Sequence, residues 1–242
     1  MQDEADLSQD HKRRRLRSTA RWLALLIIFY LAIAYALLPM LWTWRDDDAS
    51  PASTYMLTVT PQGIPGDPIN VGLIGSKEEV LRAFAAAKWD PADAITLRSS
   101  IKIGASVILD RPYPDAPVST LLYEGRRQDL AFEKPIGESA DRRHHIRLWR
   151  TSADAEDGKP TWLGSASFDR GVGVSHDTGQ ITHHIGQDVD AERDTVILDL
   201  SKAKMLSRQY QIPGRGPTTS GRNGEGDPYF TDGMVTVGVL AP

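Results

Sequence analysis

The chain of 242 residues contains no cysteine, and this absence excludes several kinds of chemistry. Without a thiol there is no cysteine nucleophile, no iron–sulfur cluster, no zinc site with sulfur ligands and no disulfide bond. A strong excess of basic charge is also missing, since the formal net charge is −4. Residues 46–242 carry 21 Lys and Arg against 28 Asp and Glu. A region this acidic is a poor candidate for binding the phosphate backbone of nucleic acid, so we expect no nucleic-acid partner.

Short signatures of several enzyme classes are missing as well. The glycine-rich residues 171–175 are not followed by Gly-Lys-Ser/Thr, which excludes a P-loop nucleotide site. Residues 164–167 (GSAS) lack the closing glycine of the G-x-S-x-G elbow, so a Ser/His/Asp triad has no support. The histidine spacing does not match the H-E-x-x-H motif of zinc hydrolases. No established catalytic signature therefore identifies an activity.

Charged side chains are absent from residues 22–44, which are rich in Leu, Ile, Ala, Tyr and Trp. As a helix this run extends roughly 34 Å, enough for a hydrocarbon core of about 30 Å. Trp22 stands at one end of the run and Trp42 and Trp44 at the other, which is typical of membrane interfaces. We therefore expect one transmembrane helix over residues 22–44.

The charges on either side of this run predict its orientation. The basic residues that precede it are Lys12, Arg13, Arg14, Arg15, Arg17 and Arg21. Three aspartates follow it at residues 46–48. The positive-inside rule then places residues 1–21 in the cytoplasm and the rest of the chain outside. The alternative is a cleaved signal peptide, but the apolar core of a signal peptide is only about 7–15 residues long.

Beyond the apolar run we expect a short tether and one folded domain. Residues 45–54 are small, polar and contain proline, as in a flexible linker. Residues 55–242 are enough for a single domain with its own core. Short strands with hairpin signals and a few helical segments predict an α+β fold with a mainly antiparallel sheet and two or three helices.

Capping signals mark the expected helices. Ser76 and Glu79 form a capping box, and Asp90-Pro91 ends that helix and begins a second one to about residue 99. Asp188 caps a third helix that extends to about Lys202. The expected strands are residues 55–60, 71–75, 119–123, 131–132, 144–150, 160–168, 176–185, 206–212 and 234–240. Asp232-Gly233 predicts a hairpin turn before the last strand, and residues 213–227 read as one long surface loop.

Several segments, taken in order, resemble one bacterial protein family. They are residues 117–132 (PVSTLLYEGRRQDLAF), 144–150 (HHIRLWR), 162–169 (WLGSASFD), 182–185 (THHI), 188–194 (DVDAERD) and 229–233 (YFTDG). Together they resemble the LssY C-terminal domain family over most of residues 67–240. Its members are often the C-terminal part of membrane proteins with phosphatase-like PAP2 or DedA-type segments. The resemblance implies a bacterial inner-membrane protein with a periplasmic domain, and it carries no established activity or catalytic residue.

Histidines are the first candidates for chemistry, because five of the six fall between residues 144 and 184. Imidazole is the commonest metal ligand, and carboxylates are frequent in the same region. Along a strand, His144 and His145 point to opposite faces, and so do His183 and His184, so each pair offers one ligand to a common site. The predicted ligands of a divalent metal are His145 and His184 with either Asp169 or Asp188, which gives a three-ligand site with an open position. The alternative is that these histidines only bond to the backbone or cap a helix.

Arginines lie on either side of the histidines in the sequence. A guanidinium group binds phosphate or carboxylate through two parallel hydrogen bonds, which suits a phosphorylated headgroup. The predicted ligand-binding residues are Arg126, Gln128, Asp129, Arg147 and Arg193. The alternative is a set of ordinary surface ion pairs with neighbouring carboxylates.

These observations leave two functions open. In the first, the domain is an accessory module that binds a partner protein, a lipid headgroup or a glycan at the membrane. In the second, it is a metal-assisted hydrolase of phosphorylated envelope lipids or their products. The two differ in whether the histidines, carboxylates and arginines meet in one pocket.

Overall fold

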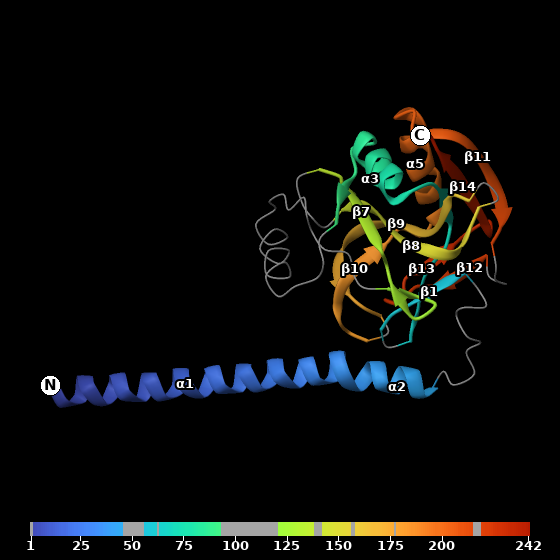
Figure 1. Cartoon of the computed structure of the whole chain (residues 1–242). Helices are drawn as coiled ribbons and strands as arrows, with labels where there is room; N and C mark the ends of the chain where they lie inside the picture. The colour runs from blue at the N-terminus through green and yellow to red at the C-terminus, as the bar shows by residue number, and fades with distance from the viewer. Residues whose placement is uncertain are drawn as a thin grey trace.

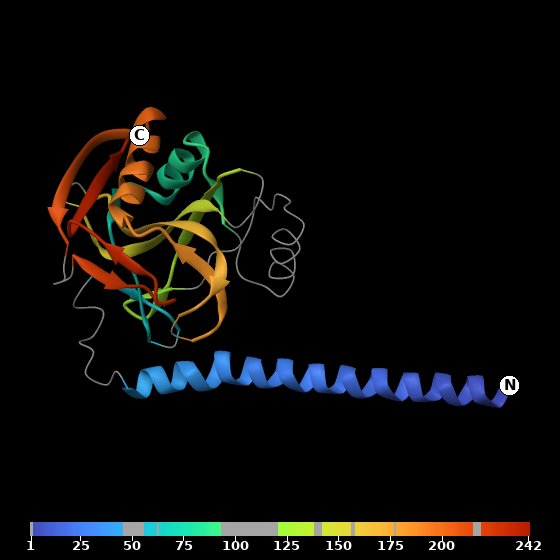
Figure 2. The ribbon, with the colours of Figure 1, turned by 180° about the vertical axis from the view of Figure 1, so that it is seen from behind.

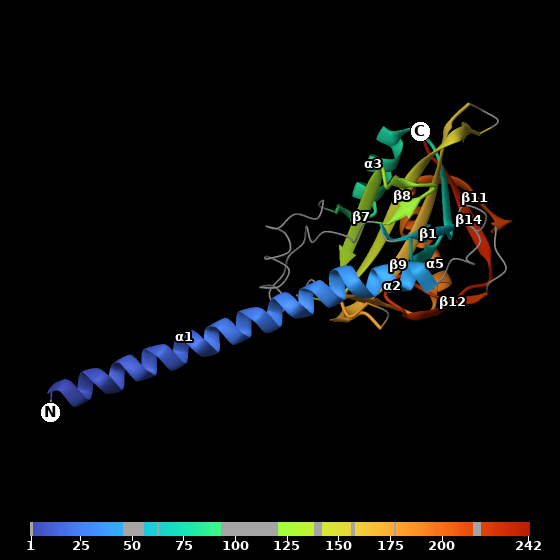
Figure 3. The same ribbon diagram turned by 90° about the horizontal axis from the view of Figure 1, so that it is seen from below.

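The computed structural model describes residues 2–45, 56–61, 63–92, 121–137, 142–155, 158–176, 178–214 and 219–242. An N-terminal helix runs through α1 (Gln2–Ala32), the π-helical turn η1 (Ile33–Leu37) and α2 (Leu38–Arg45). By length and composition, its segment Arg17–Leu41 can cross a membrane. The N-terminal part projects away from the folded domain, and the C-terminal part runs along it (Figures 1 and 3).

The π-helical turn coincides with a proline. Pro39 has no N–H group to donate, and its ring crowds the carbonyl group four residues earlier. One wider turn relieves this, since the Leu38 N–H donates to Ile33 O, five residues back. Close to this turn the helix contacts the domain: the Tyr30 hydroxyl donates to Gly179 O at 2.7 Å, and the Gln180 amide donates to Ala34 O at 3.1 Å.

The domain is built on an eight-stranded sheet in the order β11-β14-β3-β9-β8-β7-β4, with β10 also paired to β9. Its strands are β3 (Val71–Ile74), β4 (Asp90–Pro91), β7 (Leu130–Pro135), β8 (Arg143–Asp154), β9 (Pro160–Val174), β10 (Ile181–Ile185), β11 (Leu206–Pro213) and β14 (Met234–Leu240). All of these pairs are antiparallel except β14 with β3. The expected mainly antiparallel sheet is therefore confirmed.

One face of this sheet is apolar and is covered by two helices. These are α3 (Lys77–Ala86) and α5 (Val189–Lys202), which lie over the same face (Figures 1 and 2). Val80 and Phe84 of α3 and Val196 of α5 pack with Phe132 and Ile146 of the sheet in one buried cluster. At about 25 cal/mol per Å² of apolar surface removed from water, this cluster supplies much of the stability of the fold.

The other face of the sheet is partly covered by a second, smaller sheet in the order β2-β1-β5-β6. Its strands are β1 (Leu57–Val59), β2 (Pro65–Pro68), β5 (Leu122–Tyr123) and β6 (Arg126–Arg127). A third sheet pairs β12 (Ser220–Arg222) with β13 (Pro228–Phe230). Ile69, Leu121, Tyr123 and Trp149 form a small apolar cluster between the two larger sheets.

Most of the predicted local signals are confirmed. The capping box of α3 is present, with Glu79 N donating to Ser76 Oγ and Ser76 N donating to Glu79 Oε2. Asp188 caps α5 by accepting a hydrogen bond from Ala191 N at 2.9 Å. Residues 90–91 differ, because they form strand β4 beside β7, and residues 93–99 of the expected second helix lie outside the described residues.

Two predictions near the C-terminus were wrong. Asp232-Gly233 does not join a hairpin of adjacent strands: β14 pairs with β11 and β3, and β13 pairs with β12. Residues 213–227 are also more than a surface loop, since they contain β12 and the buried side chains of Asn223 and Asp227. Gly and Pro punctuate this stretch, and local turn signals cannot show that its polar side chains are needed inside the domain.

The stacked pair Phe84 and Phe132 gives a test of the helical layer, since the ring centroids lie 4.1 Å apart and both residues are fully buried. We expect Phe132→Ala to lower the free energy of unfolding by about 3–5 kcal/mol, because it leaves a cavity under α3. Urea denaturation of the full chain in detergent measures this. The control Leu81→Ala, on the exposed side of α3, should change it by less than about 1 kcal/mol. Equal effects of the two would contradict this packing.

Candidate functional site

The face of the sheet opposite the helices carries a row of buried polar side chains. Strict alternation along β8 points Arg143, His145 and Arg147 to this face, and the matching residues of β9 are serines and an aspartate. The paired residues are Arg143 with Asp169, His145 with Ser167 and Arg147 with Ser165. Each of the six is less than 5% exposed. Burying so many polar groups is tolerable only when they satisfy one another.

Arg143 forms two buried ion pairs. Its Nη1 donates to Glu133 Oε2 of β7 at 2.5 Å, and its Nε donates to Asp169 Oδ2 of β9 at 2.9 Å. The guanidinium group therefore joins the three strands β7, β8 and β9 from the middle one. Charge-assisted bonds of this kind are short and strong, and they offset the cost of removing the three ions from water.

Arg147 continues the network towards the small sheet. Its Nη1 lies 3.0 Å from His145 Nε2 and 3.3 Å from Asp67 Oδ2 of β2, and Asp67 Oδ2 also accepts from Ser167 Oγ at 3.0 Å. A guanidinium group has only donors, so His145 Nε2 must be the acceptor. Its Nδ1 then carries the proton and faces Asp169 Oδ1 at 3.3 Å. His145 therefore lies between the guanidinium group of Arg147 and the carboxylate of Asp169.

A cavity of about 20 Å³ lies beside this network. It is lined by Asp67, Leu121, His145, Arg147, Asp169, His183, Ile185 and Glu225. A space of this size holds about one water molecule or one monatomic ion. Glu225 comes from the turn between β12 and β13, and its Oε1 accepts a hydrogen bond from Thr182 Oγ1 at 3.2 Å. The cavity therefore has carboxylates from three separate parts of the chain.

The carboxyl groups around the cavity differ in pKa. Burial raises the pKa of Glu225 to about 8; the negative charge of Asp67 adds to this effect and Arg147 opposes it. Burial also acts to raise the pKa of Asp169, but the imidazoles of His145 and His183 and the Arg143 guanidinium outweigh it, so this pKa is well below its ordinary value. At neutral pH Glu225 is therefore protonated, whereas Asp169 is ionised. A site with one carboxyl group in each state is suited to holding a proton.

The predicted metal ligands are not all brought together. His145 and Asp169 line the cavity, where His145 Nε2 is occupied by Arg147. His184 Nδ1 lies instead 2.8 Å from Asp227 Oδ1, and Asp188 caps α5. The predicted site of His145 and His184 with Asp169 or Asp188 stays a prediction, and the geometry separates these four residues into three places.

The predicted ligand-binding residues are separated too. Arg126, Gln128 and Asp129 lie together at the β5–β6 end, where Arg126 donates to Arg150 O and lies 3.7 Å from Asp129. Arg147 is in the buried network. Arg193 is buried on α5, where its Nη1 donates to Asp232 Oδ1 at 2.7 Å and its Nε to Asp194 Oδ1 at 2.8 Å. These carboxylates raise the pKa of Arg193 despite its burial, and such pairing is typical of a structural arginine.

Sequence reasoning missed four members of the site: Asp67, Glu133, His183 and Glu225. Glu133 was the most accessible to prediction, because alternation along residues 130–135 points it to the same face as His145, its partner in the pairing of β7 and β8. Glu225 had no such signal, since it lies in a stretch that reads as a loop. Asp67 sits in a four-residue strand between two prolines, Pro65 and Pro68, where no periodicity is visible.

The raised pKa of Glu225 predicts a pH dependence of stability. Its value is about 8 in the folded chain and ordinarily 4.5, so the folded chain binds this proton more tightly than the unfolded chain. The contribution of this proton to the free energy of unfolding is complete below about pH 4.5 and is lost as the pH rises towards 8. We expect Glu225→Gln, which stays neutral, to exceed the wild type in free energy of unfolding at about pH 8.5 and to match it at pH 4.5. The exposed control Glu124→Gln should show no such difference. Parallel pH profiles of Glu225→Gln and wild type would contradict the assignment.

Comparison with known proteins agrees with the sequence motifs. A protein family described as LssY C-terminus matches residues 51–235, which include every strand of the eight-stranded sheet except β14, most of which lies beyond the match. Neither the curated proteins nor the solved structures contain a match to the chain. The buried network and the cavity lie within the matched residues. Because the match covers well over half of its length, the chain belongs to the LssY C-terminus family.

Proposed function

We propose that this protein is a membrane-anchored binding module at the outer face of the bacterial inner membrane, which holds an extended segment of another envelope protein. The observation that carries this proposal is strand β11, an exposed edge strand with a groove on each of its two faces. An edge strand offers unpaired backbone N–H and C=O groups to a partner strand, and side-chain pockets beside it select the partner's sequence.

Strand β11 lies at one end of the eight-stranded sheet. Among the described residues it pairs only with β14, so its other edge has no strand beside it. Seven of its eight residues are exposed, including 38% of Tyr210 and 38% of Ile212. Long exposed edge strands promote association, and proteins usually block them with short length, charges or a covering loop. β11 has a bulge near Leu206, one charged residue, Arg208, and Pro213 at its end, so residues 209–212 between them are the part of the edge suited to pair with another chain.

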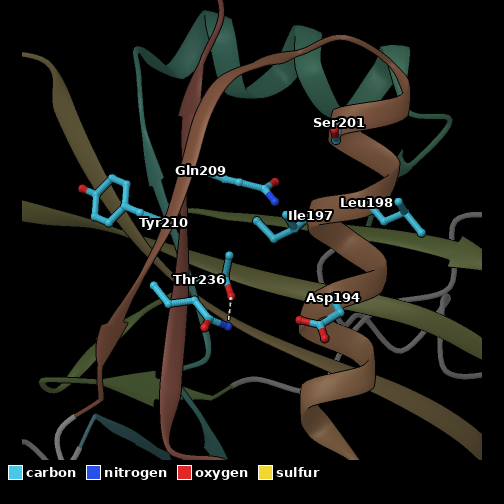
Figure 4. A pocket seen from close by; sticks show the side chains of 8 residues that line it. Asp194, Ile197, Leu198, Ser201, Gln209, Tyr210 and Thr236 are labelled. Atoms are coloured by element: carbon cyan, nitrogen blue, oxygen red, sulfur yellow. Dashed lines mark hydrogen bonds between the residues drawn. The ribbon is translucent and has the colours of Figure 1, made fainter.

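The first groove lies between β11 and α5 and has a volume of about 470 Å³. Figure 4 shows Gln209 and Thr236 facing Ile197 of α5 across this groove, while Tyr210 points away from the helix. The exposed Leu198 adds an apolar rim, and the Gln211 amide donates to Thr236 Oγ1 at 3.3 Å. The groove also carries the polar side chains of Asp194 and Ser201, and this mixture of apolar and polar groups suits side chains of a bound peptide.

The second groove lies on the opposite face of the same strand and has a volume of about 560 Å³. Its walls include Ile74 of β3, Leu163 of β9, Val237 of β14, and Tyr210 and Ile212 of β11. Because side chains of a strand alternate between faces, a strand added beside β11 would place successive side chains in the two grooves. Both grooves are far larger than the cavity of about 20 Å³ beside the buried network.

The alternative function, a metal-assisted hydrolase of phosphorylated envelope lipids, has less support from this geometry. Its predicted ligands His145, His184, Asp169 and Asp188 lie in three places, and the cavity of about 20 Å³ beside the buried network is too small for a phosphorylated lipid. A hydrolase needs the reacting group of its substrate within about 3 Å of the catalytic side chains. The hydrolase stays a prediction, and the binding module is the function that we propose.

The orientation of the anchor is part of this proposal, and the absence of cysteine makes it easy to test. We expect a cysteine introduced at Ser207, on the exposed strand β11, to react with a membrane-impermeant maleimide in intact spheroplasts. A cysteine introduced at Ser8, which precedes the apolar segment Arg17–Leu41, should react only after the membrane is permeabilised. Labelling of Ser8→Cys alone in intact cells would place the domain in the cytoplasm. A mature chain shortened by the length of the helix would show cleavage of the anchor.

Partner binding is tested by site-specific crosslinking in the membranes of the producing cell. A photoreactive phenylalanine analogue in place of Tyr210 should give one discrete adduct with another protein, because Tyr210 lies on the edge strand and faces one groove. The matched control carries the same analogue in place of Leu81, which is 39% exposed on α3, and should give no adduct. An adduct of twice the chain mass would identify a second copy as the occupant. A lack of any adduct at Tyr210 would contradict the proposal.

A further inference from the structure

We propose that His176, His184 and Asp227 bind one divalent transition-metal ion, for which zinc is the suitable probe. This inference rests on the geometry of the three side chains and is independent of the function proposed above. The three residues are on three segments: His176 follows β9, His184 is on β10, and Asp227 precedes β13.

The donor atoms of the three residues already lie at distances that suit a shared ion. His184 Nδ1 is 2.8 Å and His176 Nε2 is 3.8 Å from Asp227 Oδ1, and all three donor atoms lie within 4.8 Å of one another. In a tetrahedral zinc site, with each ligand about 2.0–2.1 Å from the ion, neighbouring donors are about 3.3 Å apart. Small side-chain rotations therefore suffice to bring the three donors around one ion.

The carboxylate of Asp227 is held in place by the backbone. Its side chain is 1% exposed, and its Oδ2 accepts a hydrogen bond from Ile185 N at 2.9 Å. Asn223 Oδ1 accepts a hydrogen bond from Asp227 N at 2.9 Å, which fixes the turn itself. A ligand whose second oxygen is bonded in this way keeps its orientation, as in the outer shell of known metal sites.

The two imidazoles are positioned as well. His176 N donates to Glu225 O at 2.9 Å, so the backbone of His176 is tied to the same turn that carries Asp227. The ring of His184 packs over Gly173, where a Cβ atom would lie only 2.3 Å from Nε2. Only glycine leaves room for this ring position. The fold thus keeps two histidines beside one buried carboxylate.

The donor set indicates the class of metal. Two imidazole nitrogens and one carboxylate oxygen suit zinc and the neighbouring first-row ions, whereas Mg²⁺ and Ca²⁺ prefer oxygen ligands alone. His176 is 61% exposed, so the ion would face solvent with at least one position open to an exchangeable ligand. Arg170 Nη2 lies 3.7 Å from Asp227 Oδ1, and its positive charge opposes a cation at this carboxylate.

The experiment is equilibrium dialysis of the full chain in detergent against zinc, with metal content measured by mass spectrometry. We expect one zinc ion per chain, and at least about tenfold weaker binding for His176→Gln and His184→Gln. The exposure of His176 means that its substitution leaves the fold intact, which circular dichroism verifies. Arg170→Gln should bind zinc more tightly than the wild type, because it removes the opposing charge.

The matched control is His145→Gln, which changes a histidine of the buried network and should retain the zinc. Zinc binding that is unchanged in His176→Gln overturns the proposal. Loss of zinc in a folded His145→Gln together with retention in His176→Gln would place the metal in the charged cavity instead. A wild-type chain that binds no zinc also overturns the proposal. None of these results depends on whether β11 binds a partner.

Discussion

The pairing of Arg143 with Glu133 and Asp169 is the constraint on which the polar side of the domain depends. These three side chains are at most 3% exposed, and an isolated charge in such a place costs several kcal/mol. Removing any one partner leaves an uncompensated buried ion, which typically costs about 3–5 kcal/mol. The small sheet and the turn before β13 therefore have to cover this face, since they exclude water and supply Asp67 and Glu225 to the network.

This constraint explains why the concentration of His, Arg and Asp in the sequence does not form an open active site. Arg147 and Arg193, two of the predicted ligand-binding residues, are each surrounded by carboxylates of the same chain. A guanidinium group that is buried and already paired cannot also hold a phosphate group without breaking those bonds. The two binding surfaces that we propose are elsewhere, along the exposed strand β11 and at the exposed His176 beside Asp227.

The sequence predicted the features that leave a pattern within one segment of the chain, and it did not predict contacts between distant segments. Alternation along β8 correctly separated His145 and Arg147 from His144 and Ile146, and the caps of Ser76 and Asp188 correctly marked two helices. Contacts between distant segments carry no such pattern. The bond from His144 to Glu192 of α5, the approach of Asp67 to Arg147 and the pairing of β11 with β14 join residues far apart in the chain. The resemblance to the LssY C-terminal domain family identified the domain, but it carried no information about these contacts.

The turn before β13 connects the two polar sites. Glu225 faces the buried cavity, and Asp227, two residues later, faces His176 and His184. Asn223 Oδ1 accepts hydrogen bonds from the backbone of both residues, at 3.1 Å from Glu225 N and 2.9 Å from Asp227 N. An ion at the proposed site of Asp227 would therefore be held by the same turn that closes the buried cavity.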